Sequence, residues 1–202
     1  MNNQTLTLAE HGPRIEEFLD TVLDLADFDV DFEVSEGETL HPDFENPEVV
    51  VKFSGADVDL LLANKAELLL ALEYIAMEAL HMPSEDHSRL SFDAQDYRAL
   101  RIEELRLSAA TAAEKVKRTG SPFRFNPMNS RERRVIHLAL RNETEVRSES
   151  SGHGGFRQVI IYPAGMASLP EAPPLPPSYQ RAGRPPVRGD RGRPRAQGRG
   201  RS

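Results

Sequence analysis

The sequence predicts an α+β protein made of two small α/β sandwich domains and a disordered tail. Apolar residues at helical spacing alternate along the chain with short stretches in which every second residue is apolar. The last part of the chain is rich in Pro, Arg and Gly and has almost nothing apolar to bury. We therefore expect a first domain at 9–96, a second at 97–165 and the tail at 166–202.

The first domain is predicted to follow the order helix, strand, strand, helix, strand. Residues 9–26 have apolar side chains at helical spacing, and residues 30–34 alternate strictly between apolar and polar. A second strand at 49–53 precedes a helix over 57–80, and residues 90–94 alternate again. The order predicts a compact sandwich of about 95 residues.

The second domain opens with a long helix over 97–118, which Gly120 terminates. Residues 123–125 are predicted as a short strand, and a helix follows to about Leu140. Strands at 146–150 and 156–162 are predicted to pair as a hairpin across a Gly-rich loop.

Charge is strongly segregated along the chain, although the net charge is only −7. Residues 1–100 hold 23 acidic and 5 basic side chains, whereas residues 101–167 hold 12 basic and 7 acidic ones. Residues 168–202 add 8 Arg against 2 acidic side chains. A polyanion such as RNA would be attracted only to the basic segments. The acidic half is expected to meet a protein partner or, alternatively, to serve solubility.

Several function classes are excluded or disfavoured by composition. Cysteine is absent, which excludes disulfides, Cys-ligated metals and a Cys nucleophile. The six His show no metal-ligand spacing, and neither a P-loop nor a G-x-S-x-G turn is found. The first ten residues do not resemble a secretory signal, and charges interrupt the apolar run Leu60–Leu80. We expect a cytoplasmic protein with no enzymatic activity, cofactor, metal or membrane insertion.

The helix that follows Asn129 is predicted to be amphipathic and cationic. Asn129 and Glu132, three residues later, fit a capping box. One side of the helix carries basic side chains: Arg133, Arg134, His137 and Arg141. The opposite side carries apolar ones: Val135, Leu138 and Ala139. Guanidinium groups suit phosphate oxygens and stack on bases, so the stripe favours an acidic ligand, with an ordinary solvated helix face as the alternative.

The motif Arg133-Arg134-Val135-Ile136-His137 resembles the R-x-x-x-H ("R-three-H") domain of single-stranded nucleic-acid-binding proteins. Further agreement comes from Asp96-Tyr97-Arg98, from Pro127-Met128 and from the run Arg157 to Pro163. The chain from 9 to 165 is similar to the Jag (SpoIIIJ-associated) family of bacterial RNA-binding proteins, in which a K homology (KH) domain precedes this domain.

The resemblance implies nucleic-acid-binding roles for Arg133, His137 and Arg157. Arg134 and Arg141 join them as members of the basic stripe. Gly152, in the hairpin loop, is a further candidate, because glycine lets backbone N–H groups approach a phosphate; its other interpretation is a plain turn residue.

The KH-like domain departs from its family at the loop that binds nucleic acid. A KH domain clamps the backbone of a single strand with a Gly-x-x-Gly loop. At the aligned positions this chain has Ala63, Asn64, Lys65 and Ala66. Methyl groups replace both glycines, so we expect weak RNA contact, or none, at this degenerate loop.

The resulting hypothesis is a post-transcriptional regulator that binds single-stranded RNA, with single-stranded DNA as the other candidate ligand. The Arg/His helix and the basic tail would supply affinity, while a solubilising or ribosome-associating role is the alternative for the tail. The competing hypothesis is a protein–protein adaptor with a vestigial KH domain and little specific RNA binding.

Overall fold

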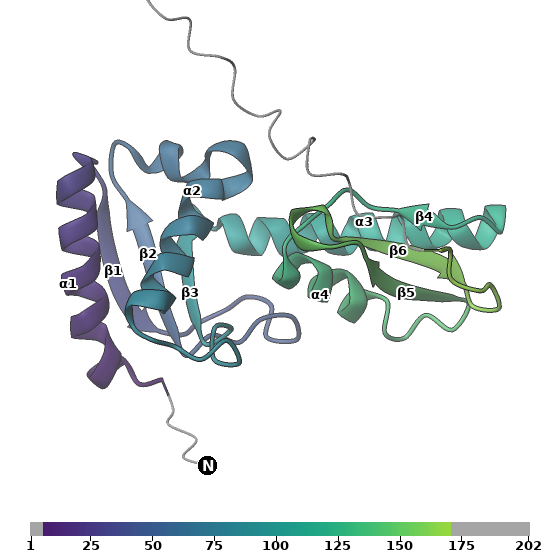
Figure 1. Ribbon diagram of the computed structural model, residues 1–202, viewed down its shortest axis with the longest axis horizontal. Coiled ribbons are helices and arrows are strands. Elements are labelled where there is room, and N and C mark those ends of the chain that lie inside the picture. Colours follow the sequence, from purple (N-terminus) through teal and green to yellow (C-terminus); the bar gives the residue numbers. More distant parts are fainter. Residues whose placement is uncertain (1–5, 171–202) are drawn as a thin grey trace, which may run out of the picture. The chain divides into compact units, whose positions relative to one another are not determined.

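A computed structural model describes residues 6–170, and a mixed three-stranded sheet lies in its N-terminal half (Figure 1). The strands are β1 (Asp31–Glu36), β2 (Val49–Ser54) and β3 (Leu90–Ala94), in that spatial order. β1 and β2 are antiparallel, whereas β2 and β3 are parallel. β2, the central strand, is more deeply buried than β1, as its run of β-branched residues requires.

Two helices pack on this sheet and complete the first hydrophobic core. They are α1 (Leu8–Ala26) and α2 (Val58–Ala79). Ile15 and Leu19 of α1 and Leu61 and Leu69 of α2 are fully buried in the same cluster as Phe92 of β3. The predicted order of elements is confirmed, with strand ends that differ by one or two residues.

The prediction of an uninterrupted helix over 57–80 is wrong. Residues 63–66 leave the helical conformation in the middle of α2, and Asn64, Lys65 and Ala66 have φ values of 52°, 64° and 58°. Apolar residues flank the break on both sides without a Gly or Pro between them. Hydrophobic periodicity therefore runs across the break and cannot reveal it.

The second half contains another three-stranded sheet, of order β4-β6-β5, with antiparallel pairing throughout. Its elements are α3 (Tyr97–Thr119), β4 (Phe123–Arg124), α4 (Ser130–Ala139), β5 (Val146–Ser151), the 3₁₀ turn η1 (Gly154–Phe156) and β6 (Gln158–Pro163). α3 and α4 share a core with β5 and β6 that includes Ala113, Ile136 and Ile161. These elements are as predicted, except that Phe156 lies in the turn and β6 starts later, at Gln158.

Contacts of the second sheet continue beyond residue 165, where the tail is expected to begin. The Arg147 guanidinium lies 4.5 Å from the ring centre of Tyr162 and donates to the carbonyl of Met166 at 2.7 Å. The backbone N–H of Leu169 donates to the Tyr162 hydroxyl. The rest of the predicted tail, 171–202, lies outside the described residues.

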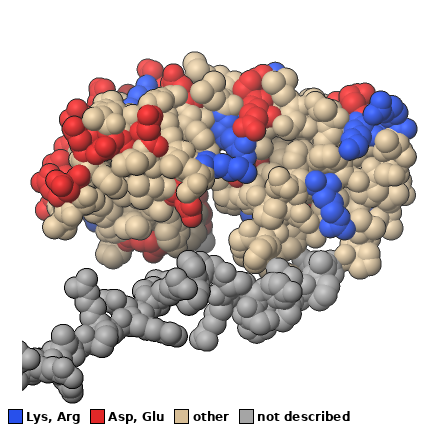
Figure 2. Space-filling view, turned by 90° about the horizontal axis from the view of Figure 1, so that it is seen from above, with Lys and Arg blue, Asp and Glu red and all other residues tan. Residues whose placement is uncertain are grey.

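Acidic and basic side chains gather over different parts of the surface. On the face drawn in Figure 2, acidic residues cluster over the half that contains α1, and basic residues appear mainly over the other half. Within residues 6–170, no helix combines the length and apolarity that crossing a membrane requires. The same residues contain no group of three or more His, Asp or Glu placed to hold a metal ion.

Candidate nucleic-acid interface

The helix α4 carries the predicted binding residues, and its N-terminus is fixed by its own sequence. The Asn129 side chain accepts from the backbone N–H of Glu132 at 2.9 Å, and the Glu132 carboxylate accepts from the N–H of Asn129 at 3.0 Å. This reciprocal capping box satisfies two otherwise unpaired donors. Glu132 also binds Arg101 of α3 at 2.7 Å, so the cap ties α4 to its neighbouring helix.

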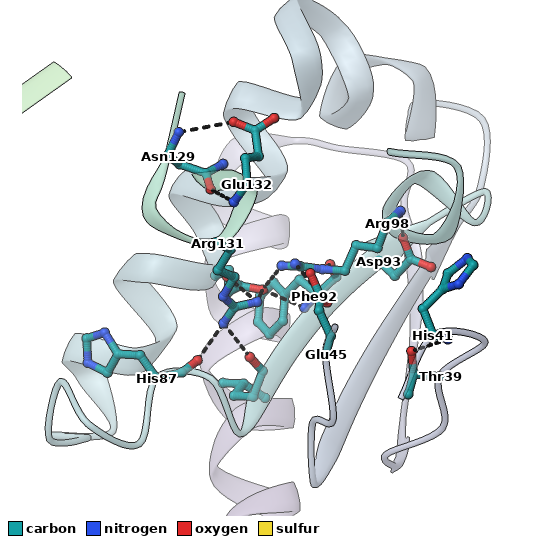
Figure 3. A network of polar contacts seen from close by, with 12 residues as sticks. Thr39, His41, Glu45, His87, Phe92, Asp93, Arg98, Asn129, Arg131 and Glu132 are labelled. Carbon is teal, nitrogen blue, oxygen red and sulfur yellow. Dashed lines mark hydrogen bonds and ion pairs between the residues drawn. The ribbon is translucent and has the colours of Figure 1, made fainter. Parts of the chain in front are cut away.

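Arg131 anchors the same end of α4 to the first half of the chain. Its guanidinium donates to the carbonyls of His87 and Leu90, the latter at 2.9 Å, and lies 3.3 Å from the Glu73 carboxylate (Figure 3). Glu73, in α2, is itself only 6% exposed. Breaking such a buried pair leaves an uncompensated charge, so the orientation of α4 depends on residues of the first core.

Glu73 is the acceptor at the centre of this network. Besides Arg131, it accepts from the backbone N–H of Phe92 at 2.8 Å and from the Arg98 guanidinium. Arg98 in turn donates to the Phe92 carbonyl and pairs with Glu45. Helices α2, α3 and α4 and strand β3 therefore meet at one carboxylate.

Arg133 and His137 lie against β5 rather than pointing freely into solvent. The His137 Nδ1 lies 2.7 Å from the Ser148 hydroxyl, and its Nε2 lies 3.0 Å from the Ser150 hydroxyl. The Arg133 guanidinium donates to the same Ser150 hydroxyl at 3.2 Å. Both serines face the helix because alternate residues of a strand point to one side. The two serines thus set the positions of Arg133 and His137.

Arg157 joins this pair at the start of β6. Counting in steps of two along the strand, Arg157 falls on the same side as Val159 and Ile161, which belong to the core that α4 covers. The Arg157 carbonyl accepts from the backbone N–H of Met128, just before the helix. Burial and, secondarily, the nearby Arg157 charge lower the pKa of Arg133. Burial and then the charge of Arg133 lower the pKa of His137. The site therefore gathers positive groups in a partly desolvated place, where an anion would relieve their repulsion.

None of the predicted binding arginines is neutralised by a carboxylate within residues 6–170. The ion pairs there engage other cations: Arg89, Arg98, Arg101, Arg106, Lys117, Arg131 and Arg147. The buried Nε of Arg133 has no hydrogen-bond partner. Arg134, Arg141 and Arg157 are exposed. With no carboxylate bound to it within residues 6–170, the rest of the Arg133 guanidinium is suited to an incoming oxyanion.

The basic stripe is only partly as predicted. Arg134 and Arg141 are exposed, whereas Arg133 and His137 are half-buried. On the apolar side Val135 is buried as expected, but Leu138 and Ala139 are only partly buried, while Ile136 and Leu140 are fully in the core. The side of the helix that carries Arg133 and His137 therefore faces β5, which explains their contacts with Ser148 and Ser150.

Gly152 is required by the shape of the hairpin loop. Its φ is +97°, and a Cβ at this position would lie 2.7 Å from the carbonyl oxygen of Phe156. No other residue fits without shifting the backbone. This geometry supports the turn interpretation of Gly152.

Residues 63–66, where the resemblance implies a degenerate KH loop, have a left-handed backbone at Asn64, Lys65 and Ala66. Ala63, Asn64 and Lys65 are exposed, Ala66 is buried, and the Lys65 carbonyl accepts from the Tyr97 hydroxyl at 2.9 Å. Non-glycine residues adopt positive φ only at an energetic penalty. The methyl groups of Ala63 and Ala66 stand where a Gly-x-x-Gly loop would have none.

Reasoning from the sequence missed three contributors to this interface. Ser148 and Ser150 position His137, and their spacing of two on a predicted strand was a usable signal. Arg131 was not considered in the sequence analysis; unlike Arg133, it faces Glu73 instead of β5. No local pattern signals that difference, because the partner is 58 residues away.

Comparison with known proteins places this geometry in a family. Residues 103–163 match the R-three-H domain, and this range includes Arg133 and His137. A protein of Clostridium symbiosum, named RNA-binding protein KhpB, is 37% identical over 145 residues, which are 72% of this chain and 63% of the relative. Proteins of the same name from Lactiplantibacillus plantarum and Bacillus subtilis are each 30% identical, over 60% and 54% of this chain and 38% and 53% of their own length.

The chain thus spans less than two thirds of the length of these relatives. The domain match covers most of α3 and all of α4, β5 and β6, the unit that holds Arg133, His137 and Arg157. These matches confirm the family resemblance: residues 103–163 form an R-three-H domain, in a chain related to the Jag family.

Proposed function

We propose that this chain binds single-stranded RNA through a cationic surface formed by α4, the residue that follows Leu140 and the residue directly before β6, here called the Arg/His surface. It consists of Arg133, Arg134, His137, Arg141 and Arg157. The observation that carries the proposal is that Arg133 and His137 are held in place by two serines while no carboxylate neutralises them within residues 6–170. Positioned, unpaired cations are what a phosphodiester backbone requires.

We propose that the chain binds RNA and catalyses no reaction on it. Hydroxyls of Ser148 and Ser150 occupy both nitrogens of His137, which leaves neither available as a general base in the absence of rearrangement. The relatives named as RNA-binding proteins support RNA over single-stranded DNA as the ligand. We place the activity in the cytoplasm and in post-transcriptional regulation.

The N-terminal part, 9–96, is proposed to be a KH-like domain whose nucleic-acid loop is inactive. Its order of elements and the left-handed turn at 63–66 support the KH-like assignment. Asp59 and Glu67 are exposed beside the turn, and Ala63 and Ala66 replace its glycines. Negative charge and added methyl groups both oppose a phosphate there.

This acidic part is proposed to meet a protein partner instead of RNA. Residues 1–100 carry 23 of the 32 acidic residues of the chain. The Arg/Gly residues of 166–202 are proposed to add charge-driven affinity for RNA, because guanidinium groups contact phosphates and stack on bases without a fixed fold.

The proposal is tested by measuring the affinity for a labelled single-stranded RNA by fluorescence anisotropy at several salt concentrations. Arg133→Ala with His137→Ala should weaken binding about tenfold or more, and the log–log salt slope should fall by about 0.7 for each phosphate that the variant no longer neutralises. Arg118→Ala with His81→Ala removes the same residue types from exposed positions and serves as the matched control.

An unchanged affinity in the Arg133/His137 variant, with its thermal unfolding also unchanged, would contradict the Arg/His surface. A single-stranded DNA of the same sequence and an RNA duplex complete the comparison. Equal affinity for the duplex would refute single-strand preference.

A further inference from the structure

The hairpin loop next to the Arg/His surface presents an exposed aromatic ring. Phe156 is 57% exposed at the end of η1, directly before Arg157. Within the matched residues 103–163, it is the large aromatic side chain that the structure leaves exposed. Phe123 and Phe125, in contrast, are partly buried against the core.

The backbone around Phe156 is held rather than loose. Its N–H donates to the His153 carbonyl at 3.1 Å, and the N–H of Arg157 donates to the Gly154 carbonyl at 3.3 Å. On the following residue, the Arg157 carbonyl accepts from Met128 at 3.1 Å. The close approach of Gly152 to the Phe156 carbonyl fixes the other side of the loop. A ring in a held loop loses little conformational entropy when a ligand covers it.

The two residues before Phe156 are glycines with open space around them. A Cβ added at Gly154 or Gly155 would find no heavy atom within 4 Å. The two residues that precede Phe156 therefore place no side chain over the loop, and a flat ligand can approach.

We propose that Phe156 is a stacking platform for an unpaired base of the RNA strand whose phosphates bind Arg133, His137 and Arg157. This inference rests on the proposed function and specifies its ligand: a strand with at least one unstacked base next to the bound phosphates. Every base has an aromatic face, so a phenyl ring recognises an unpaired base without reading its identity. A duplex keeps its bases stacked on one another and offers no such face.

The test uses the absence of tryptophan from the chain. Phe156→Trp introduces a single indole, whose fluorescence a stacked base quenches on titration with single-stranded RNA. Leu107→Trp is the matched control, because Leu107 is 55% exposed on α3. Quenching is expected at position 156 and not at position 107.

Affinity provides the second measurement. Phe156→Leu should weaken binding of a single-stranded RNA about tenfold, whereas Phe156→Tyr should keep it, since stacking contributes about 1–3 kcal/mol per base, or roughly 5- to 150-fold. An abasic strand of the same length retains the phosphates, so wild type and Phe156→Leu should bind it equally. Thermal unfolding of each variant checks the fold.

The outcomes separate this inference from the function on which it rests. Equal affinity of Phe156→Leu and wild type for the base-bearing strand, with weakened binding in the Arg133/His137 variant, overturns stacking and leaves the Arg/His surface intact. Equal weakening on base-bearing and abasic strands also overturns it, because Phe156 then acts on loop structure. Failure of wild type to bind either strand overturns both proposals.

Discussion

The Nδ1 atom of His137 on α4 lies 2.7 Å from the hydroxyl oxygen of Ser148 on β5. This contact, with the one from Nε2 to Ser150, fastens the helix to the strand through an imidazole ring. A hydroxyl both donates and accepts, so the two serines accommodate either neutral tautomer of the ring. The same residue that would contact a phosphate therefore also joins two elements of the fold.

Protonation of His137 is expected to destabilise the fold. Burial, followed by the charge of Arg133, lowers the pKa of His137 in the folded chain below its ordinary value of 6.5. Just below pH 6.5 the unfolded chain then binds more protons than the folded one, so the free energy of unfolding rises with pH. The contribution of neutral His137 to the free energy of unfolding is complete above the ordinary pKa of 6.5, and it is lost as the pH falls through the lower pKa of the folded chain. Urea unfolding at about pH 5 to 7.5 should show a shallower pH dependence for His137→Gln than for wild type.

RNA binding is expected to respond to pH in the opposite sense. A phosphate beside His137 favours the charged imidazole and raises the pKa of His137 in the complex. Binding then takes up a proton, so the affinity should increase as the pH is lowered from about 8 to about 6, as long as the protein stays folded. Anisotropy titrations at each pH should show this dependence in wild type and lose it in His137→Gln. A dependence that persists in the variant would assign the proton to another group.

Glu73→Gln should strongly destabilise the chain. The carboxylate compensates the positive charges of Arg98 and Arg131, and it is only 6% exposed. Removal of one partner of a buried pair typically costs about 3–5 kcal/mol. Chemical denaturation measures the change in the free energy of unfolding, and Glu67→Gln, an exposed position in the same helix, provides the control. A destabilisation below about 1 kcal/mol would show that the two arginines find water or other acceptors.

The break in α2 predicts opposite effects for two glycine substitutions. Lys65 has a φ of 64° and an exposed side chain, so Lys65→Gly removes left-handed strain and should stabilise the fold by up to about 1 kcal/mol. Ala63 has a φ of −56°, so Ala63→Gly gains nothing and should destabilise by about 0.5–1 kcal/mol. Thermal unfolding of both variants compares them. Destabilisation by both would indicate a continuous helix at this position.

A chain that ends at Gly165 should be less stable than one that ends at Pro170. The longer chain keeps the carbonyl of Met166 as an acceptor for Arg147 and the N–H of Leu169 as a donor to Tyr162. Without these two hydrogen bonds, the stability should be lower by about 1–2 kcal/mol. Comparing the melting temperatures of the two truncated chains tests this difference in stability. RNA-binding experiments on removal of the tail should use the chain that ends at Pro170.

Local signals were sufficient to predict most of the elements. The capping box at Asn129 and Glu132, the alternation in β3 and the Gly-rich hairpin are determined by neighbouring residues, and the structure has them in the predicted places. Periodicity missed the break at 63–66 because a left-handed turn of Asn, Lys and Ala has no compositional mark, and only the family resemblance pointed to a loop there. The contacts of His137 with β5 were not predicted, because the serines that bind it come from another element.

The side-chain contacts of Arg131 bear on how the R-three-H segment should be studied. Its acceptors are Glu73, His87 and Leu90, and all three precede residue 97. A fragment starting at 97 would lack all three acceptors, so the Arg131 side chain would be exposed and the N-terminal end of α4 would lose this anchor. We expect the RNA affinity of that fragment to be lower than that of the whole chain. Residues before 97 would then contribute to binding by aligning α4, without contacting the RNA themselves.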